Sequence, residues 1–95
     1  MAVKIIIRRK VPKGKEEELL PLLVELRSLA TAQKGYISGE TLRNLNEPED
    51  YVVISTWQSV DNWNAWSVNS QRTVIQEKID ALLGAETEYG AYLYG

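Results

Sequence analysis

Hydrophobic and polar positions follow two different periods in the first third of the chain. Residues 3–11 are rich in β-branched side chains, and Val3, Ile5 and Ile7 fall on one face of an extended segment. Between residues 15 and 34, apolar residues recur at helical spacing and form one stripe. The pattern therefore predicts a strand followed by a helix.

The rest of the chain continues this alternation of strand-like and helix-like segments. Turn-forming residues fill positions 44–50, between two segments with strand character. The pattern predicts strands over 36–43 and 51–58, a short helix over 59–68, a helix from 69 or 70 to 84, and a last strand over 86–94.

Single residues mark the ends and irregularities of these elements. Ser59 is typical of a helix N-cap, and Gly35 and Gly84 are typical of helix ends. Pro21 removes one backbone donor, so we expect a kink, or a helix that becomes regular only after it. Gly39 inside a strand indicates a bulge or a close approach by another backbone.

The order β-α-β-β-α-β is typical of an α+β fold of the ferredoxin-like class, an antiparallel sheet with its helices on one face. In this fold the first and last strands are antiparallel neighbours. We expect Glu86 and Glu88 to lie beside Lys10 and Arg8, where opposite charges across strands stabilise the pair. This pairing accounts for the basic run around Arg9.

The predicted sheet carries apolar residues on both of its faces. Residues 5–7 and 52–54 are apolar at every position, whereas a sheet with one face in water alternates more strictly. An exposed apolar sheet face usually marks an interface. We therefore expect a homodimer in which two sheets pack face to face, since twofold pairs are the commonest closed assemblies.

Composition limits the chemistry available to the chain. Its 95 residues suit a single domain over 1–95. The chain has neither Cys nor His, which excludes thiolate nucleophiles, disulfides, and the commonest general base and metal ligand. A net charge of −2 argues against nucleic-acid binding. The apolar run at the start is too short for a signal peptide or membrane span, so we expect a cytoplasmic protein.

The stretch from Trp57 to Trp66 is the most specific motif. A strand ends in Trp57, Ser59 can cap a helix, and Trp63 and Trp66 follow three residues apart. Together with residues 11–14 and 33–39, this stretch resembles the antibiotic biosynthesis monooxygenase domain family over nearly the whole chain. The resemblance implies a dimeric α+β barrel of two ferredoxin-like units, each with a pocket between helices and sheet.

The resemblance implies different site residues for two branches of that family. The haem-degrading branch has a His on the second long helix and an Asn on the first strand, where this chain has Gln76 and Ile7. Its Trp matches Trp66. The cofactor-free oxygenase branch has an Asn and a Trp one helical turn apart, which Asn62 and Trp66 match. We therefore expect no haem, flavin, metal or other cofactor.

These positions make up the predicted site. As catalytic residues, Asn62 would hydrogen-bond a substrate oxyanion and Trp66 would stack on the ring. The predicted substrate-binding residues are Trp57, Trp63, Arg72 and Tyr36. Each has a purely structural alternative: the tryptophans as core or interface residues, Asn62 as a solvated residue of a first helical turn, and Arg72 as a surface residue.

The sequence thus favours a cofactor-independent monooxygenase that uses O₂ to oxidise a small aromatic substrate such as a hydroquinone or anthrone. In such chemistry the deprotonated substrate itself donates electrons to O₂, and the protein binds the anion and excludes water. One alternative is a non-catalytic dimeric module that binds a small apolar ligand or a protein partner. Another is an isomerase or lyase, which turns over its substrate without oxygen.

Overall fold

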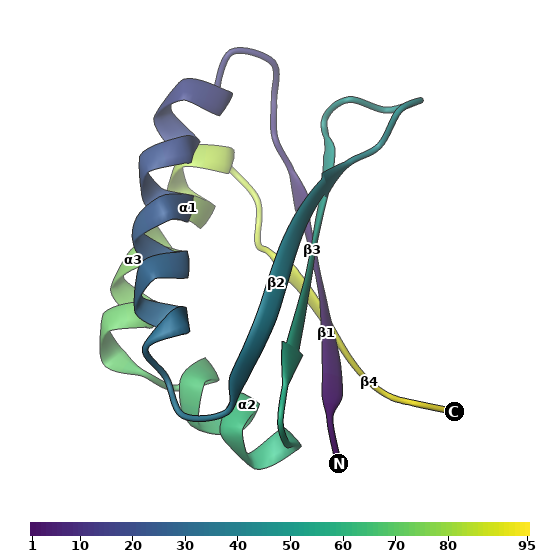
Figure 1. The fold of residues 1–95 in the computed structure, drawn as a ribbon. Helices are drawn as coiled ribbons and strands as arrows, with labels where there is room; N and C mark the ends of the chain where they lie inside the picture. The colour runs from purple at the N-terminus through teal and green to yellow at the C-terminus, as the bar shows by residue number, and fades with distance from the viewer.

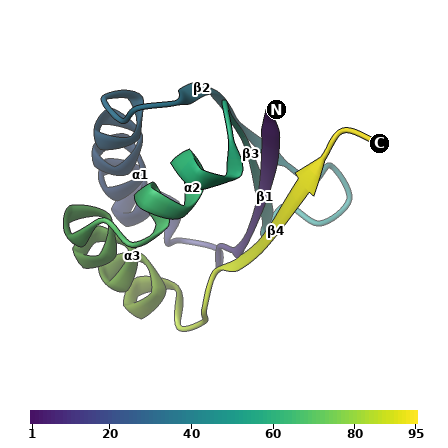
Figure 2. The ribbon, with the colours of Figure 1, turned by 90° about the horizontal axis from the view of Figure 1, so that it is seen from below.

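A computed structural model describes all 95 residues as a four-stranded antiparallel sheet with three helices on one face (Figures 1 and 2). The strand order is β2-β3-β1-β4, so β1 and β3 are the central strands. This is the predicted ferredoxin-like fold, with the short α2 added before α3. The elements are β1 (Val3–Lys10), α1 (Glu16–Thr31), β2 (Tyr36–Arg43), β3 (Asp50–Trp57), α2 (Val60–Ser67), α3 (Ser70–Leu83) and β4 (Glu88–Leu93).

β1 turns alternate side chains toward the helices. Val3, Ile5 and Ile7 are buried on the inner face, and the same alternation places Arg9 there too, only 6% exposed. Ile6 lies between them on the outer face and is half-buried. The strand therefore carries a buried cation at the position where its apolar series ends.

α1 is one helix that begins before Pro21 and continues through it. The prediction that the helix becomes regular only after Pro21 is wrong. Pro21 and Glu17 are both exposed, so the backbone carbonyl left without a helical donor can bond to water. The helix ends at Thr31, earlier than predicted, and Gly35 at φ +87° turns the chain into β2.

The bulge in β2 lies between Tyr36 and Ser38 and not at Gly39. Gly39 instead allows the side chains of Tyr36 and Arg27 to approach the β2 backbone closely. A Cβ there would lie 2.7 Å from the Tyr36 hydroxyl oxygen and 3.6 Å from Nη2 of Arg27. Gly39 thus leaves room for two side chains and not for another backbone.

The predicted ends of α2 and α3 are confirmed. Ser59 Oγ accepts from the backbone N–H of Asn62 at 3.2 Å, and Asn69 Oδ1 accepts from that of Arg72 at 3.1 Å. Gly84 ends α3 in the left-handed conformation at φ +71°. These caps fix where α2 and α3 begin and where α3 ends.

Surface ion pairs differ from the prediction. Arg8 is opposite Glu88 in the β1–β4 register as expected. Its ion pair is nevertheless with Asp50 of β3, at 4.0 Å, and Lys10 pairs with Glu47 at 3.5 Å. The Arg8 and Lys10 side chains are more than half exposed, so these pairs contribute little to stability.

The hydrophobic core has two parts. One lies between the sheet and α2, and the other lies between α1 and α3 with Val11. Figure 2 shows all three helices on the same side of the sheet, which leaves the other face without a layer over it. The space between α1 and the inner sheet face is only partly filled by the core, and the candidate site lies there.

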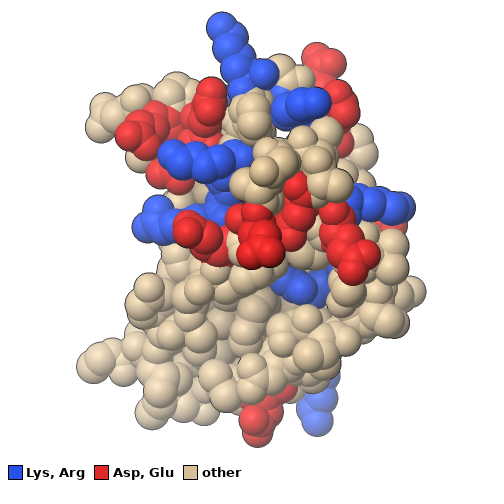
Figure 3. All heavy atoms as spheres, turned by 180° about the vertical axis from the view of Figure 1, so that it is seen from behind, with Lys and Arg blue, Asp and Glu red and all other residues tan.

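The surface opposite the view of Figure 1 is divided by charge. Lys, Arg, Asp and Glu gather in the upper half of Figure 3, and the lower half is largely uncharged. The C-terminal end of β4 is in the lower part of Figure 1, and Tyr92, Leu93 and Tyr94 are all exposed there. No helix has the length and apolarity needed to cross a membrane.

Candidate active site

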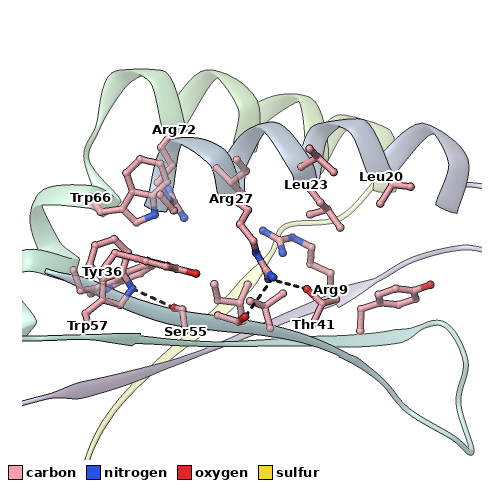
Figure 4. A pocket seen from close by; sticks show the side chains of 18 residues that line it. Arg9, Leu20, Leu23, Arg27, Tyr36, Thr41, Ser55, Trp57, Trp66 and Arg72 are labelled. Carbon is pink, nitrogen blue, oxygen red and sulfur yellow. Dashed lines mark hydrogen bonds between the residues drawn. The ribbon is translucent and has the colours of Figure 1, made fainter. Parts of the chain in front are cut away.

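A cavity of about 290 Å³ lies between α1 and the inner face of the sheet (Figure 4). Twelve of its eighteen lining residues are hydrophobic. These twelve come from α1, α2 and the strands β1, β2 and β3, and α3 contributes Arg72. A concave, mainly apolar site with few polar groups is typical of small-molecule binding. The volume limits the ligand to a small compound.

One end of the cavity is aromatic. The Trp57 ring is stacked with Trp66 at a centroid distance of 6.3 Å and an interplanar angle of 25°. Tyr36 meets Trp57 edge-on at 5.3 Å, and Trp63 meets it at 6.0 Å. All three tryptophans of the chain line the cavity, so a flat aromatic ligand has matching surfaces there.

The indole N–H groups of Trp57 and Trp66 differ in their hydrogen bonding. Trp57 Nε1 donates to Ser55 Oγ at 3.2 Å, and both residues are buried. The indole N–H of Trp66 donates to no acceptor of the protein. Trp66 lines the cavity, and its indole N–H is not used by the protein.

The charges in the cavity lining are all positive. Arg9, Arg27 and Arg72 line it, and no Asp or Glu does. Arg72 Nη2 donates to the Tyr89 hydroxyl oxygen at 2.6 Å, and the guanidinium carbon lies 5.7 Å from the Trp63 ring centroid. The cavity consequently favours an anionic ligand.

Arg9 is the most deeply buried of these cations. Its Nη2 donates to Gln76 Oε1 at 3.1 Å, and its Nε has no hydrogen-bond partner. Burial lowers the pKa of the Arg9 guanidinium below its ordinary value, and the charge of Arg72 acts in the same direction. Tyr89 and Asp80 oppose this shift in pKa. No carboxylate pairs directly with Arg9.

Gln76 is held in turn by a network behind Arg9. Its Nε2 donates to Asp80 Oδ1 and to Thr87 Oγ1, each at 2.8 Å, and the Thr87 hydroxyl donates to the same Asp80 oxygen at 2.8 Å. Gln76, which stands where the haem-degrading branch has its His, therefore supports Arg9. No group of three or more acidic side chains anywhere in the structure could hold a metal ion.

The family model described as antibiotic biosynthesis monooxygenase matches residues 2–78. The chain belongs to the antibiotic biosynthesis monooxygenase family. No curated protein sequence gives a significant match.

Solved structures show that this family member has a widely shared fold. A conserved protein from Methanosarcina mazei Go1 has a TM-score of 0.91 at 19% identity, covering 100% of this chain and 94% of that one. SnoaB, a cofactor-independent oxygenase from Streptomyces nogalater, has a TM-score of 0.86 at 18% identity, covering 99% and 93%. Rv0793 from Mycobacterium tuberculosis has a TM-score of 0.86 at 14% identity, covering 100% and 96%.

Five of the six predicted site residues of this antibiotic biosynthesis monooxygenase family member line the cavity. They are Trp57, Trp63, Trp66, Arg72 and Tyr36.

Asn62, the sixth predicted site residue, is not among the lining residues. Its Oδ1 accepts from Ser59 Oγ at 2.7 Å, and its side chain packs where a Cβ on Gly35 would collide with it. Asn62 is on the α2 turn that faces the start of β2, and its oxygen is used in the helix cap.

Sequence reasoning missed Arg9 and Arg27 as cavity residues of the family member. A signal for Arg9 was present, because the alternation of Val3, Ile5 and Ile7 places it on the inner face. Ion pairs on the outer face account for Arg8 and Lys10, the sequence neighbours of Arg9, but not for Arg9 itself. Arg27 follows Leu23 by four residues, and both line the cavity from α1.

Proposed function

We propose that this protein is a cofactor-independent monooxygenase that uses O₂ to oxidise a small electron-rich aromatic compound, such as an anthrone or hydroquinone. The observation that carries the proposal is the pairing of an aromatic wall with a lining whose charged groups are all guanidinium groups. Such a site favours the deprotonated form of an aromatic substrate, which is the form that reacts with O₂.

The reaction balances without an external reductant. For an anthrone, the ring CH₂ loses a proton to solvent water at the cavity mouth and becomes an enolate, which transfers electrons to O₂; the two CH₂ hydrogens are recovered in the water formed. One oxygen atom forms a new bond to that carbon and becomes a carbonyl, and the other leaves as water. The substrate supplies all four electrons, so the protein's tasks are to bind the anion, orient it and exclude bulk water.

Three of the cavity residues have a defined task in this scheme. Trp66 and Trp57 hold the substrate ring, and the free Trp66 N–H donates to a substrate oxygen. Arg72, fixed by Tyr89, stabilises the enolate charge because an adjacent cation lowers the pKa of a bound acid. Asn62, which does not line the cavity, acts in this scheme through its hydrogen bonds with Ser59 at the start of α2.

The test is oxygen consumption by metal-stripped protein with a panel of anthrones and hydroquinones. We expect uptake above the autoxidation blank, and ¹⁸O₂ should label one product oxygen and one water. Trp66→Phe should reduce this uptake, whereas Tyr94→Phe, an exposed aromatic outside the cavity, should not. No protein-dependent uptake with any compound would contradict the proposal.

One observation favours a second candidate, a non-catalytic module that binds a small aromatic anion. The cavity lining has no carboxylate or imidazole to serve as a general base. The two candidates differ in oxygen use, because a binding module is stabilised by its ligand without consuming O₂.

We also propose that the protein is a homodimer through the outer sheet face. Ile6 of β1 is directly opposite Ile54 of β3, and Val52 is opposite Leu42 of β2. Strand alternation puts these side chains on the face opposite to the cavity residues Ile7 and Val53, and Figure 2 shows no helix over that face. A second copy of the same face would bury them symmetrically.

A further inference from the structure

Arg9 is a buried cation that the protein itself does not neutralise. Its side chain is 6% exposed, its one hydrogen bond is to the neutral amide of Gln76, and its Nε has no partner. The nearest acidic group in its hydrogen-bond network is Asp80, which is separated from it by Gln76. Buried charges in proteins are normally paired.

The surroundings hold Arg9 in place for a ligand. Gln76 donates to Asp80 and to Thr87, and Thr87 donates to the same Asp80 oxygen, each at 2.8 Å, so the bond from Arg9 to Gln76 has little freedom. A guanidinium whose orientation is fixed before binding loses less conformational entropy when an anion arrives. The network therefore supports Arg9 without neutralising it.

The position of Arg9 separates it from the aromatic end. Figure 4 shows Trp66, Trp57 and Arg72 toward one end of the cavity, and Arg9 with Arg27 further along it. A ring stacked among the tryptophans would extend any substituent toward the two arginines. The Arg27 guanidinium also donates only to uncharged acceptors, which are the Gly39 carbonyl and the Thr41 hydroxyl.

We infer that the natural ligand is an aromatic compound with a carboxylate substituent, and that Arg9 binds this carboxylate. The inference rests on the proposed function in taking the cavity as the substrate site. It adds the substrate class, an aromatic carboxylate, and assigns Arg9 as the residue that selects it. A planar singly charged carboxylate matches the guanidinium plane and suits an otherwise apolar cavity.

Calorimetric titration with matched ligands tests this inference apart from turnover. The probes are benzoate, 4-phenylbenzoate and anthracene-2-carboxylate, each compared with its neutral primary amide of nearly the same shape. None is an anthrone or hydroquinone, so binding is measured without oxygen chemistry. We expect the native protein to bind the best carboxylate at least about tenfold more tightly than its amide.

Variants assign the preference to Arg9. Arg9→Met should reduce the carboxylate preference to about threefold or less, and Arg9→Lys should retain part of it, because the charge remains without the planar guanidinium. Arg8→Met is the matched control. Arg8 is the same residue type on the same strand, but it lies exposed on the opposite face and pairs with Asp50.

Two results would overturn the inference. One is a native protein that binds each carboxylate no better than its amide, which needs no folded variant. The other is an Arg9→Met protein that keeps the full preference. Oxygen uptake with neutral anthrones is a separate measurement, so its failure would remove the oxygenase and leave the carboxylate result standing.

Discussion

The guanidinium of Arg27 donates to the hydroxyl oxygen of Thr41 at 3.0 Å, and this bond joins α1 to β2 at the rim of the cavity. A second bond from Arg27 to the Gly39 carbonyl, at 3.3 Å, strengthens the same link. Both partners line the cavity, and Arg27 is itself exposed. The rim is therefore held by one side chain that can release without disturbing the core.

Arg27→Met should speed the exchange of ligands with the cavity. Because both rim hydrogen bonds are exposed, their loss should cost about 0.5–1 kcal/mol in total and raise the dissociation rate by roughly two- to fivefold. Stability should change by only about 0.5 kcal/mol, since the bonds are exposed. Stopped-flow tryptophan fluorescence measures the rate, with Arg43→Met, which lies outside the cavity lining, as the control. Equal rates in native and variant proteins would contradict this role.

Trp66→Phe should weaken substrate use while the protein remains folded. The smaller ring loses stacking area and the free N–H donor, so kcat/KM should fall by about tenfold, equivalent to about 1.4 kcal/mol. Oxygen uptake measures the loss, and near-ultraviolet circular dichroism checks the fold. Unchanged kcat/KM with anthrones would mean that the ring binds elsewhere.

Asn62→Ala separates a positioning role from a catalytic one. The variant loses the 2.7 Å bond from Ser59 and its packing on Gly35, so unfolding free energy should fall by about 1 kcal/mol. For a domain of this size, that corresponds to a melting temperature lower by about 4–8 °C. Turnover below the melting range should stay within about twofold of native. A loss as large as that of Trp66→Phe would instead place Asn62 at the substrate.

Arg9→Met should not destabilise the ligand-free protein. Replacing a buried, unpaired charge by an apolar side chain removes a desolvation cost, which offsets the bond lost to Gln76. We expect the melting temperature to be unchanged or higher by about 4–8 °C, equivalent to about 1 kcal/mol. Scanning calorimetry without ligand measures it. A clear decrease would show that Arg9 serves the fold and not the site.

Ile54→Lys should dissociate the proposed dimer. The new charge would be placed on the outer face opposite Ile6, where a second copy would have to bury it. Light scattering should give about twice the 10.8 kDa chain mass for the native protein and about one chain mass for the variant. A native protein that is monomeric at micromolar concentration would contradict the proposed interface.

The sequence by itself determined the order and type of the elements. Ser59, Asn69 and Gly84 mark helix ends because capping depends on backbone groups within three or four residues. The alternation in β1 likewise follows from strand geometry alone. The family resemblance carried by the segment from Trp57 to Trp66 also required no coordinates, and five of the six candidate residues line one cavity.

Only the tertiary structure decided which side chains share the cavity and which do not. Arg9 and Gln76 are 67 positions apart, and their bond depends on how α3 packs over β1. Arg8 pairs with Asp50 and not with Glu88 because two strands flank β1 and their side chains compete. Asn62 has the spacing of a site residue, yet its side chain packs against the turn at Gly35. Local patterns specify backbone conformation, whereas long-range contacts depend on how the elements pack, which no local pattern contains.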